Sequence, residues 1–149
     1  MTQDAVRDFA RRLEQLLPQV MRGFVRRHHC FAYKDKVTLS QMFILEYLQE
    51  HSPSRMTELA NFMKVSAAAS TGMVQRLVLL GYIQREYNQK DRRVVMIRIS
   101  AKGSEFLKKM NQQRFHMISS VFGKLTEKDR QEYLRIITQV RDILEKEDN

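Results

Sequence analysis

Apolar residues recur at intervals of three and four over residues 4–29, which is the spacing of a helix with one apolar face. Pro18 interrupts this stripe and would remove one backbone hydrogen bond from a continuous helix. We therefore expect either one kinked helix or a short helix followed by a second. The apolar positions of the stripe are Val6, Phe9, Leu13, Leu16, Leu17, Val20 and Phe24.

Three shorter helices are predicted next by the same spacing. Thr38 or Ser40 can cap the first of them, and Ser66 is a natural N-cap for the third. Gly81 is suited to the left-handed conformation that often follows the last turn of a helix, so the third helix should stop there. The three helices are expected at about residues 38–50, 57–63 and 67–80.

After Gly81 the hydrophobic period changes from 3.6 residues to two. Residues 82–87 and 95–100 both alternate between apolar and polar positions, and a polar segment separates them. This pattern predicts a β-hairpin with a polar tip. A long helix should then cover about residues 101–122, and the run from Thr126 to Asp129 resembles a capping box that opens a last helix ending near residue 145.

Three short helices followed by a β-hairpin indicate a winged helix-turn-helix, whose second helix can enter the major groove of DNA. The predicted fold class is mainly α with a small β-hairpin wing. Residues 37–100 would form the DNA-binding lobe, and residues 1–36 and 101–149 a helical dimerisation region, all within a single intertwined domain. The terminal apolar stripes are too long for one small lobe to cover, so we expect a homodimer.

The charge of the chain fits this picture. Its 149 residues include 26 basic and 17 acidic ones, for a net charge of +9, and residues 55–98 alone hold eight basic against three acidic residues. A basic stretch at the helix-turn-helix favours nucleic acid as a partner. The single cysteine excludes an internal disulfide, and the charged N-terminus lacks an apolar signal core, so a cytoplasmic location is expected without membrane attachment.

The ordered motifs resemble those of the MarR family of bacterial transcriptional regulators, and the similarity covers about residues 20–145. The matching residues are Thr38-Leu39-Ser40-Gln41 with Leu45, Glu58-Leu59-Ala60 with Val65-Ser66, Arg76-Leu77, Gly81-Tyr82-Ile83, Asp91-Arg92-Arg93, Val95, Ile97, Ile99-Ser100 and Lys102-Gly103. This resemblance implies a homodimeric repressor that binds a near-palindromic site in double-stranded DNA. Gly72 departs from the family, which usually has a polar or basic residue there.

We predict that DNA is contacted by the recognition helix, about residues 66–80, in the major groove and by the wing, residues 88–94, in the minor groove. The resemblance places Arg93 in the minor groove, with Asp91 orienting it. In the helix the predicted contacts are Ser66, Ala67, Ala68, Ser70, Thr71, Gln75 and Arg76. In the wing they are Lys90, Asp91, Arg92 and Arg93.

The resemblance also implies release of DNA by a small aromatic or lipophilic effector between the dimerisation helices and the lobe. The residues that would line this crevice are Phe24, His28, Phe31, Met42, Phe43 and Tyr47. Each of them is also explained by ordinary core packing.

Cys30 lies beside two histidines and two arginines, an environment that can lower the pKa of a thiol, so a redox-responsive regulator is an alternative. A metal-responsive regulator is another, although adjacent histidines on a helix point in different directions and no metal site is predicted. A winged-helix module for protein contacts is a third. The sequence has no Gly-rich phosphate loop or hydrolase motif, so we expect no enzyme and no cofactor.

Overall fold

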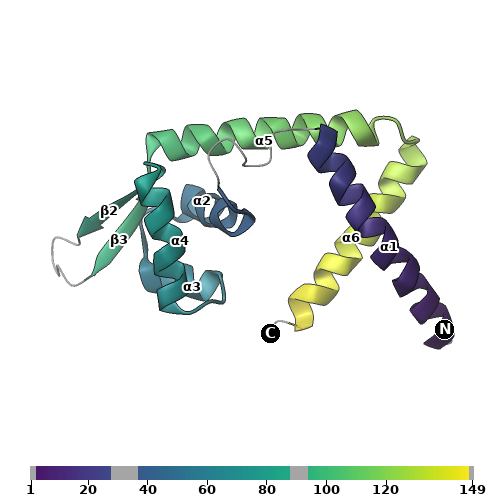
Figure 1. Ribbon diagram of the computed structural model, residues 1–149, viewed down its shortest axis with the longest axis horizontal. Helices are drawn as coiled ribbons and strands as arrows, with labels where there is room; N and C mark the ends of the chain where they lie inside the picture. Colours follow the sequence, from purple (N-terminus) through teal and green to yellow (C-terminus); the bar gives the residue numbers. More distant parts are fainter. Residues whose placement is uncertain (1–2, 28–36, 88–93, 148–149) are drawn as a thin grey trace. The chain divides into compact units, whose positions relative to one another are not determined.

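The computed structural model describes residues 3–27, 37–87 and 94–147 as six helices and three short strands (Figure 1). Most of the elements lie where the hydrophobic pattern predicted them. In chain order they are α1 (Gln3–Arg27), α2 (Leu39–His51), β1 (Ser54–Arg55), α3 (Met56–Phe62), α4 (Ala67–Leu79), β2 (Ile83–Tyr87), β3 (Val95–Ile99), α5 (Ala101–Phe122) and α6 (Glu127–Glu147).

The first apolar stripe forms one helix, because α1 continues through Pro18. The alternative of two separate helices is therefore wrong. A proline inside a helix removes a single hydrogen bond, and the turns on either side keep theirs. Most apolar side chains of α1 remain exposed, from 39% at Leu13 to 64% at Phe9, whereas Phe24 is half-buried.

The wing belongs to a three-stranded antiparallel sheet with the order β1-β3-β2, whereas the sequence predicted only the hairpin of β2 and β3. In the added strand Ser54 pairs with Ile97, and Arg55 pairs with Met96. Ser52, just before it, accepts a hydrogen bond on its Oγ from the backbone N–H of Ile99 at 3.2 Å. These contacts tie the segment after α2 to the base of the wing.

A single apolar core lies beneath the helix-turn-helix and the sheet. Ile44, Leu45 and Leu48 of α2 are fully buried in it. The other core residues come from α2 and the segment before it, from α3 and α4, from β2 and β3 with the residue before β2, and from the first half of α5. They are Val37, Met42, Leu59, Val74, Leu77, Tyr82, Ile83, Ile97, Leu107 and Met110.

The helix ends predicted at Thr38, Ser66 and Gly81 are confirmed, and each of them depends on residues only a few positions apart in the sequence. Thr38 caps α2: its Oγ1 accepts from the N–H of Gln41 at 3.3 Å, and the side-chain Oε1 of Gln41 accepts from the N–H of Thr38 at 2.9 Å. Ser66 caps α4. Gly81 follows α4 with a φ of 77°, a value that strains other residues.

The chain divides into two compact units, Met1–Gln113 and Arg114–Asn149. The boundary between these units lies within α5, and the division into a DNA-binding lobe of residues 37–100 flanked by residues 1–36 and 101–149 stays a prediction. A common dimerisation region made from both ends of the chain stays a prediction. None of the described helices is long and apolar enough to cross a membrane.

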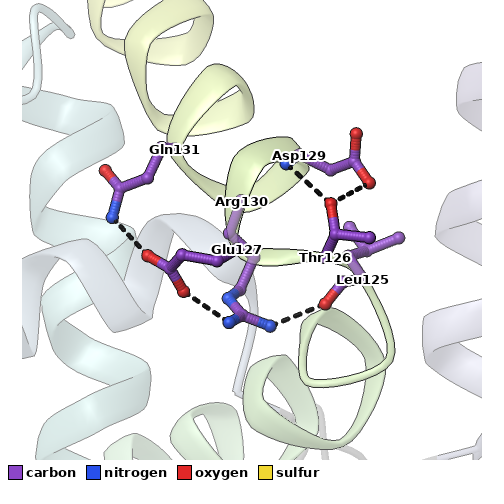
Figure 2. A network of polar contacts seen from close by, with 6 residues as sticks. All are labelled: Leu125, Thr126, Glu127, Asp129, Arg130 and Gln131. Atoms are coloured by element: carbon purple, nitrogen blue, oxygen red, sulfur yellow. Dashed lines mark hydrogen bonds and ion pairs between the residues drawn. The ribbon is translucent and has the colours of Figure 1, made fainter.

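In the second unit the turn between α5 and α6 is held by a polar network (Figure 2). Thr126 Oγ1 accepts from the N–H of Asp129 at 3.2 Å, which confirms the predicted cap. Arg130 donates to the backbone oxygen of Leu125 at 2.7 Å and to Glu127, which also accepts from Gln131 at 2.8 Å. The hydrogen bond from Gln131 is the largest of the causes that lower the pKa of Glu127, followed by the hydrogen bond and the charge of Arg130.

Candidate nucleic-acid interface

A tight turn connects α3 to α4 and determines where α4 begins. Lys64 has a φ of 50°, which brings the chain around within a few residues. The N–H of Lys64 donates to the backbone oxygen of Asn61 and the N–H of Val65 to that of Ala60, both at 3.1 Å. Ala60 is itself buried, so the turn is anchored on the core of the lobe.

The N-terminus of α4 is exposed. Ser66 accepts the N–H of Ala69 on its Oγ at 3.2 Å, which leaves its hydroxyl proton available to another acceptor. The first amides of a helix point out of its N-terminus, and the helix dipole favours negative charge there. This end of α4 therefore has the chemistry of a phosphate contact.

The two sides of α4 differ sharply. Ser70, Val74 and Leu77 are fully buried against the lobe. The opposite side is exposed and carries no charge, and it consists of Ala67, Ala68, Thr71, Gly72 and Gln75. This division agrees with the helical spacing in the sequence.

Three residues of the exposed side differ in what they can offer a base. The hydroxyl of Thr71 donates to the backbone oxygen of Ala67 at 2.8 Å, so it can still accept but not donate a hydrogen bond. The amide of Gln75 can do both. A Cβ at Gly72 would meet no atom within 4 Å, so the surface is open at this point.

The predicted contact from Ser70 is wrong for its side chain. Ser70 lies on the buried side of α4 with no exposed surface. Among the described residues its Oγ has no hydrogen-bond partner. The helical spacing in the sequence already places Ser70 on the same side of the helix as Val74 and Leu77, and this is the side that is buried.

Two of the described cations in the lobe are Arg76, within α4, and Arg98, in β3. The guanidinium of Arg76 is exposed and forms no ion pair within the part of the chain that the structure describes, so it is available for a phosphate. Arg98 is engaged by Glu86 across the wing strands at 3.2 Å. The predicted wing residues Lys90, Asp91, Arg92 and Arg93 lie outside the described residues.

The predicted effector residues that the structure describes lie in different environments, and their common role stays a prediction. Met42 is in the core of the lobe at 8% exposure, while the next residue, Phe43, is 44% exposed. The ring of Tyr47 is stacked on His51 and on Phe62, at 4.6 and 4.4 Å between centroids. Phe24 is half-buried near the end of α1. The remaining predicted residues, His28, Phe31 and the redox candidate Cys30, lie outside the described residues.

The sequence prediction left out the residues that hold the far end of α4. Ser100 and Lys102, at the start of α5, donate to backbone oxygens just after α4, each at 2.7 Å. The sequence feature that could have pointed to these two residues is the glycine at position 103. Glycine is unfavourable in the first turn of a helix unless close packing requires it.

Comparison with known proteins assigns the central part of the chain. The model of the MarR family matches residues 37–95, which include the helix-turn-helix and the first residue of β3. The HTH-type transcriptional regulator YpoP of Bacillus subtilis is 30% identical over 103 residues, which are 68% of this chain and 72% of that protein. The HTH-type transcriptional repressor MdtR of the same organism is 31% identical over 96 residues, covering 64% and 62% of the two chains.

The fold extends over nearly the whole chain in a solved structure. The YusO protein of Bacillus subtilis aligns with 95% of this chain and 99% of its own, with a TM-score of 0.76. Its sequence identity is 24%, so this likeness supports the fold.

Proposed function

Since this chain belongs to the MarR family of DNA-binding transcriptional regulators, we propose that it is a homodimeric repressor that reads double-stranded DNA through α4. One observation carries the proposal: the exposed side of α4 is uncharged and built from small residues around Gln75. Small side chains let a helix lie deep in the major groove, and a long polar side chain among them can reach the base edges.

The exposed residues of α4 divide between base and phosphate contacts. Gln75 can form two hydrogen bonds with adenine, and Thr71 can accept from an exocyclic amine. The methyl groups of Ala67 and Ala68 can contact thymine methyl groups. The remaining two polar residues, Ser66 and Arg76, suit phosphates, which position the protein without reading sequence.

The wing, residues 88–94, adds a cluster of positive charge. Lys90, Arg92 and Arg93 are three cations within four residues, accompanied by Asp91. We assign Arg93 to the minor groove, where arginine favours narrow A·T-rich segments. This assignment rests on the sequence and the family, since these residues lie outside the described part of the chain.

The dimer is supported by the apolar side chains that α1 and α6 leave exposed. In α6 they include Leu134 at 56%, Ile143 at 57% and Leu144 at 59%. A second copy of the chain could bury such a surface, and a two-fold dimer would require a near-palindromic DNA site. Repression is supported by the similarity to MdtR, which is a transcriptional repressor.

Release by a small aromatic or lipophilic effector is the part of the proposal that rests on the family alone. Of the two predicted lobe residues Met42 and Phe43, Phe43 keeps 44% of its surface exposed and could contact such a molecule, whereas Met42 is buried. Titrating small aromatic acids into the protein–DNA complex would test this by fluorescence anisotropy. Release of the DNA supports the effector, and unchanged anisotropy across the series opposes it.

Selection of bound sequences from random double-stranded DNA tests the central proposal. We expect the purified protein to enrich a near-palindrome. Gln75→Ala should weaken binding to it by about 1–3 kcal/mol for each half-site and relax the preference at one position in each half-site. Gln113→Ala, an exposed glutamine of α5, is the matched control and should leave the profile unchanged.

Two outcomes would contradict the proposal. If no sequence is enriched, sequence-specific DNA binding is excluded. If DNA binding also depends only weakly on salt, a winged-helix module for protein contacts is favoured. A Gln75→Ala profile identical to that of the natural chain would remove Gln75 from the base contacts and with it the observation that carries the proposal.

A further inference from the structure

The far end of α4 is terminated by a glycine and then meets the first turn of α5. Gly81 has a φ of 77°, and its N–H donates to the backbone oxygen of Val78 at 2.9 Å. The N–H of Tyr82 donates to the oxygen of Leu77, also at 2.9 Å. This pair of bonds is the Schellman motif, which ends a helix sharply and leaves other carbonyls facing outwards.

The backbone oxygens of Leu80 and Gly81 take no part in this pair of bonds. The first turn of α5 supplies hydrogen-bond donors for both of them. Lys102 Nζ donates to the oxygen of Leu80, and Ser100 Oγ donates to that of Gly81, each at 2.7 Å. Ser100 also caps α5, because its Oγ accepts the N–H of Gly103 at 3.0 Å. One serine thus joins the exit of α4 to the entry of α5.

The two backbones approach too closely for any side chain at position 103. A Cβ on Gly103 would lie 2.3 Å from the backbone oxygen of Tyr82. The ring of Tyr82 is buried, stacks on Phe106 at 4.6 Å and has the Lys102 ammonium 5.1 Å from its centroid. The ammonium therefore lies between a helix C-terminus, which carries partial negative charge, and the face of an aromatic ring.

We propose that Lys102 is a positioning residue for DNA binding, which holds the C-terminal end of α4 on α5 and does not itself contact DNA. The inference rests on the proposed function, in which α4 reads the bases. The ammonium group of Lys102 is engaged by the Leu80 carbonyl and the Tyr82 ring, so its removal takes away one of the contacts that hold the exit of α4 on α5. A recognition helix that is less firmly oriented loses affinity without losing a phosphate contact.

Lys102→Met tests this role, because methionine keeps most of the apolar stem and lacks the charge. Lys102→Arg should restore binding, and Lys108→Met, at an exposed lysine of the same helix, is the matched control. Affinity for the selected DNA is measured at several salt concentrations by fluorescence anisotropy. Amide hydrogen exchange at Gly81 and Tyr82 is measured without DNA.

We expect Lys102→Met to weaken binding roughly three- to tenfold with an unchanged salt dependence, and to speed exchange at both amides. A fall of about 1.8 in the slope of log affinity against log salt, about 0.9 for each subunit of the dimer, would overturn the inference, since it would make Lys102 a phosphate contact. Unchanged affinity or unchanged exchange would also overturn it. If the natural chain itself binds no DNA selectively, the proposed function fails. If the natural chain binds selectively and Lys102→Met binds equally well, only the role of Lys102 fails.

Discussion

Gly72 has no structural reason to be glycine within the described part of the chain. It lies in the interior of α4, is exposed, and would meet no atom within 4 Å if it carried a Cβ. Glycine in a helix interior costs about 1 kcal/mol relative to alanine, because it loses more backbone freedom on folding. This cost is explained if the DNA backbone or a base edge comes close to α4 at this point.

Gly72→Ala should therefore stabilise the fold and weaken DNA binding together. The expected gain is about 0.5–1 kcal/mol in the free energy of unfolding, measured by urea denaturation. Affinity for the selected DNA should fall, because the added methyl group occupies the space of the closest approach. Unaltered or tighter binding would show that α4 has room at position 72 in the complex.

Ser70→Ala is the control on the buried side of the same helix. The Oγ of Ser70 is buried and has no hydrogen-bond partner among the described residues, so its removal should also stabilise the fold, by about 1 kcal/mol. DNA affinity should stay the same, since the side chain does not reach the surface. Loss of affinity in both variants would mean that stabilising α4, rather than occupying position 72, weakens binding.

Residue environments could be predicted from the sequence where helical spacing determines them. The buried positions of α4, Val74 and Leu77, follow from the three- and four-residue period. The period does not show whether a buried polar group such as Ser70 has a partner, because that depends on neighbouring elements. Nor does it show that Tyr47 stacks on Phe62, which belongs to a different helix.

At the scale of elements, the predictions succeeded where the signal lay within one segment. Ser66, Gly81 and Thr126 each mark a helix end through contacts a few residues away, and all three were predicted. The strand β1 was not predicted, because two residues show no alternation and their order comes from pairing with β3, which is more than forty residues away in sequence. The junction of α4 with α5 was missed for the same reason.

Thr126→Ala should destabilise the first turn of α6. The substitution removes the hydroxyl that accepts the N–H of Asp129, and loss of such a cap costs about 1 kcal/mol. Amide hydrogen exchange at Asp129 and Arg130 should become faster, while Thr126→Ser keeps the acceptor and should preserve the slow exchange. Equal exchange in all three proteins would mean that the contacts of Arg130 in Figure 2 hold the turn by themselves.

For the molecule as a whole, charge and exposed apolar surface lie on different parts of the sequence. More than half of the net charge of +9 is in residues 55–98, around the helix-turn-helix. The exposed apolar side chains are concentrated on α1 and α6. The sequence predicted this separation, but it could not show which surfaces pair in a dimer, because that information belongs to two chains.

Ile137→Asp tests whether the apolar side of α6 forms the dimer interface. Ile137 is 45% exposed, and burying a charge there against a second copy would be strongly unfavourable. Light scattering and sedimentation equilibrium should find a dimer at micromolar concentration for the natural chain and a monomer for the variant. Thr138→Asp places the same charge on the next residue and should remain a dimer.

The same two variants also connect assembly with DNA recognition. A dimer binds both halves of a near-palindrome at once, so the second half-site is bound at a high effective concentration. Ile137→Asp should therefore lose most of its affinity for the full site and little for an isolated half-site, whereas Thr138→Asp should match the natural chain on both. A natural chain that is monomeric, or an Ile137→Asp variant that stays dimeric, would place the interface elsewhere or remove it. Equal losses on the full and half sites would instead indicate that the substitution disturbs the DNA-binding lobe.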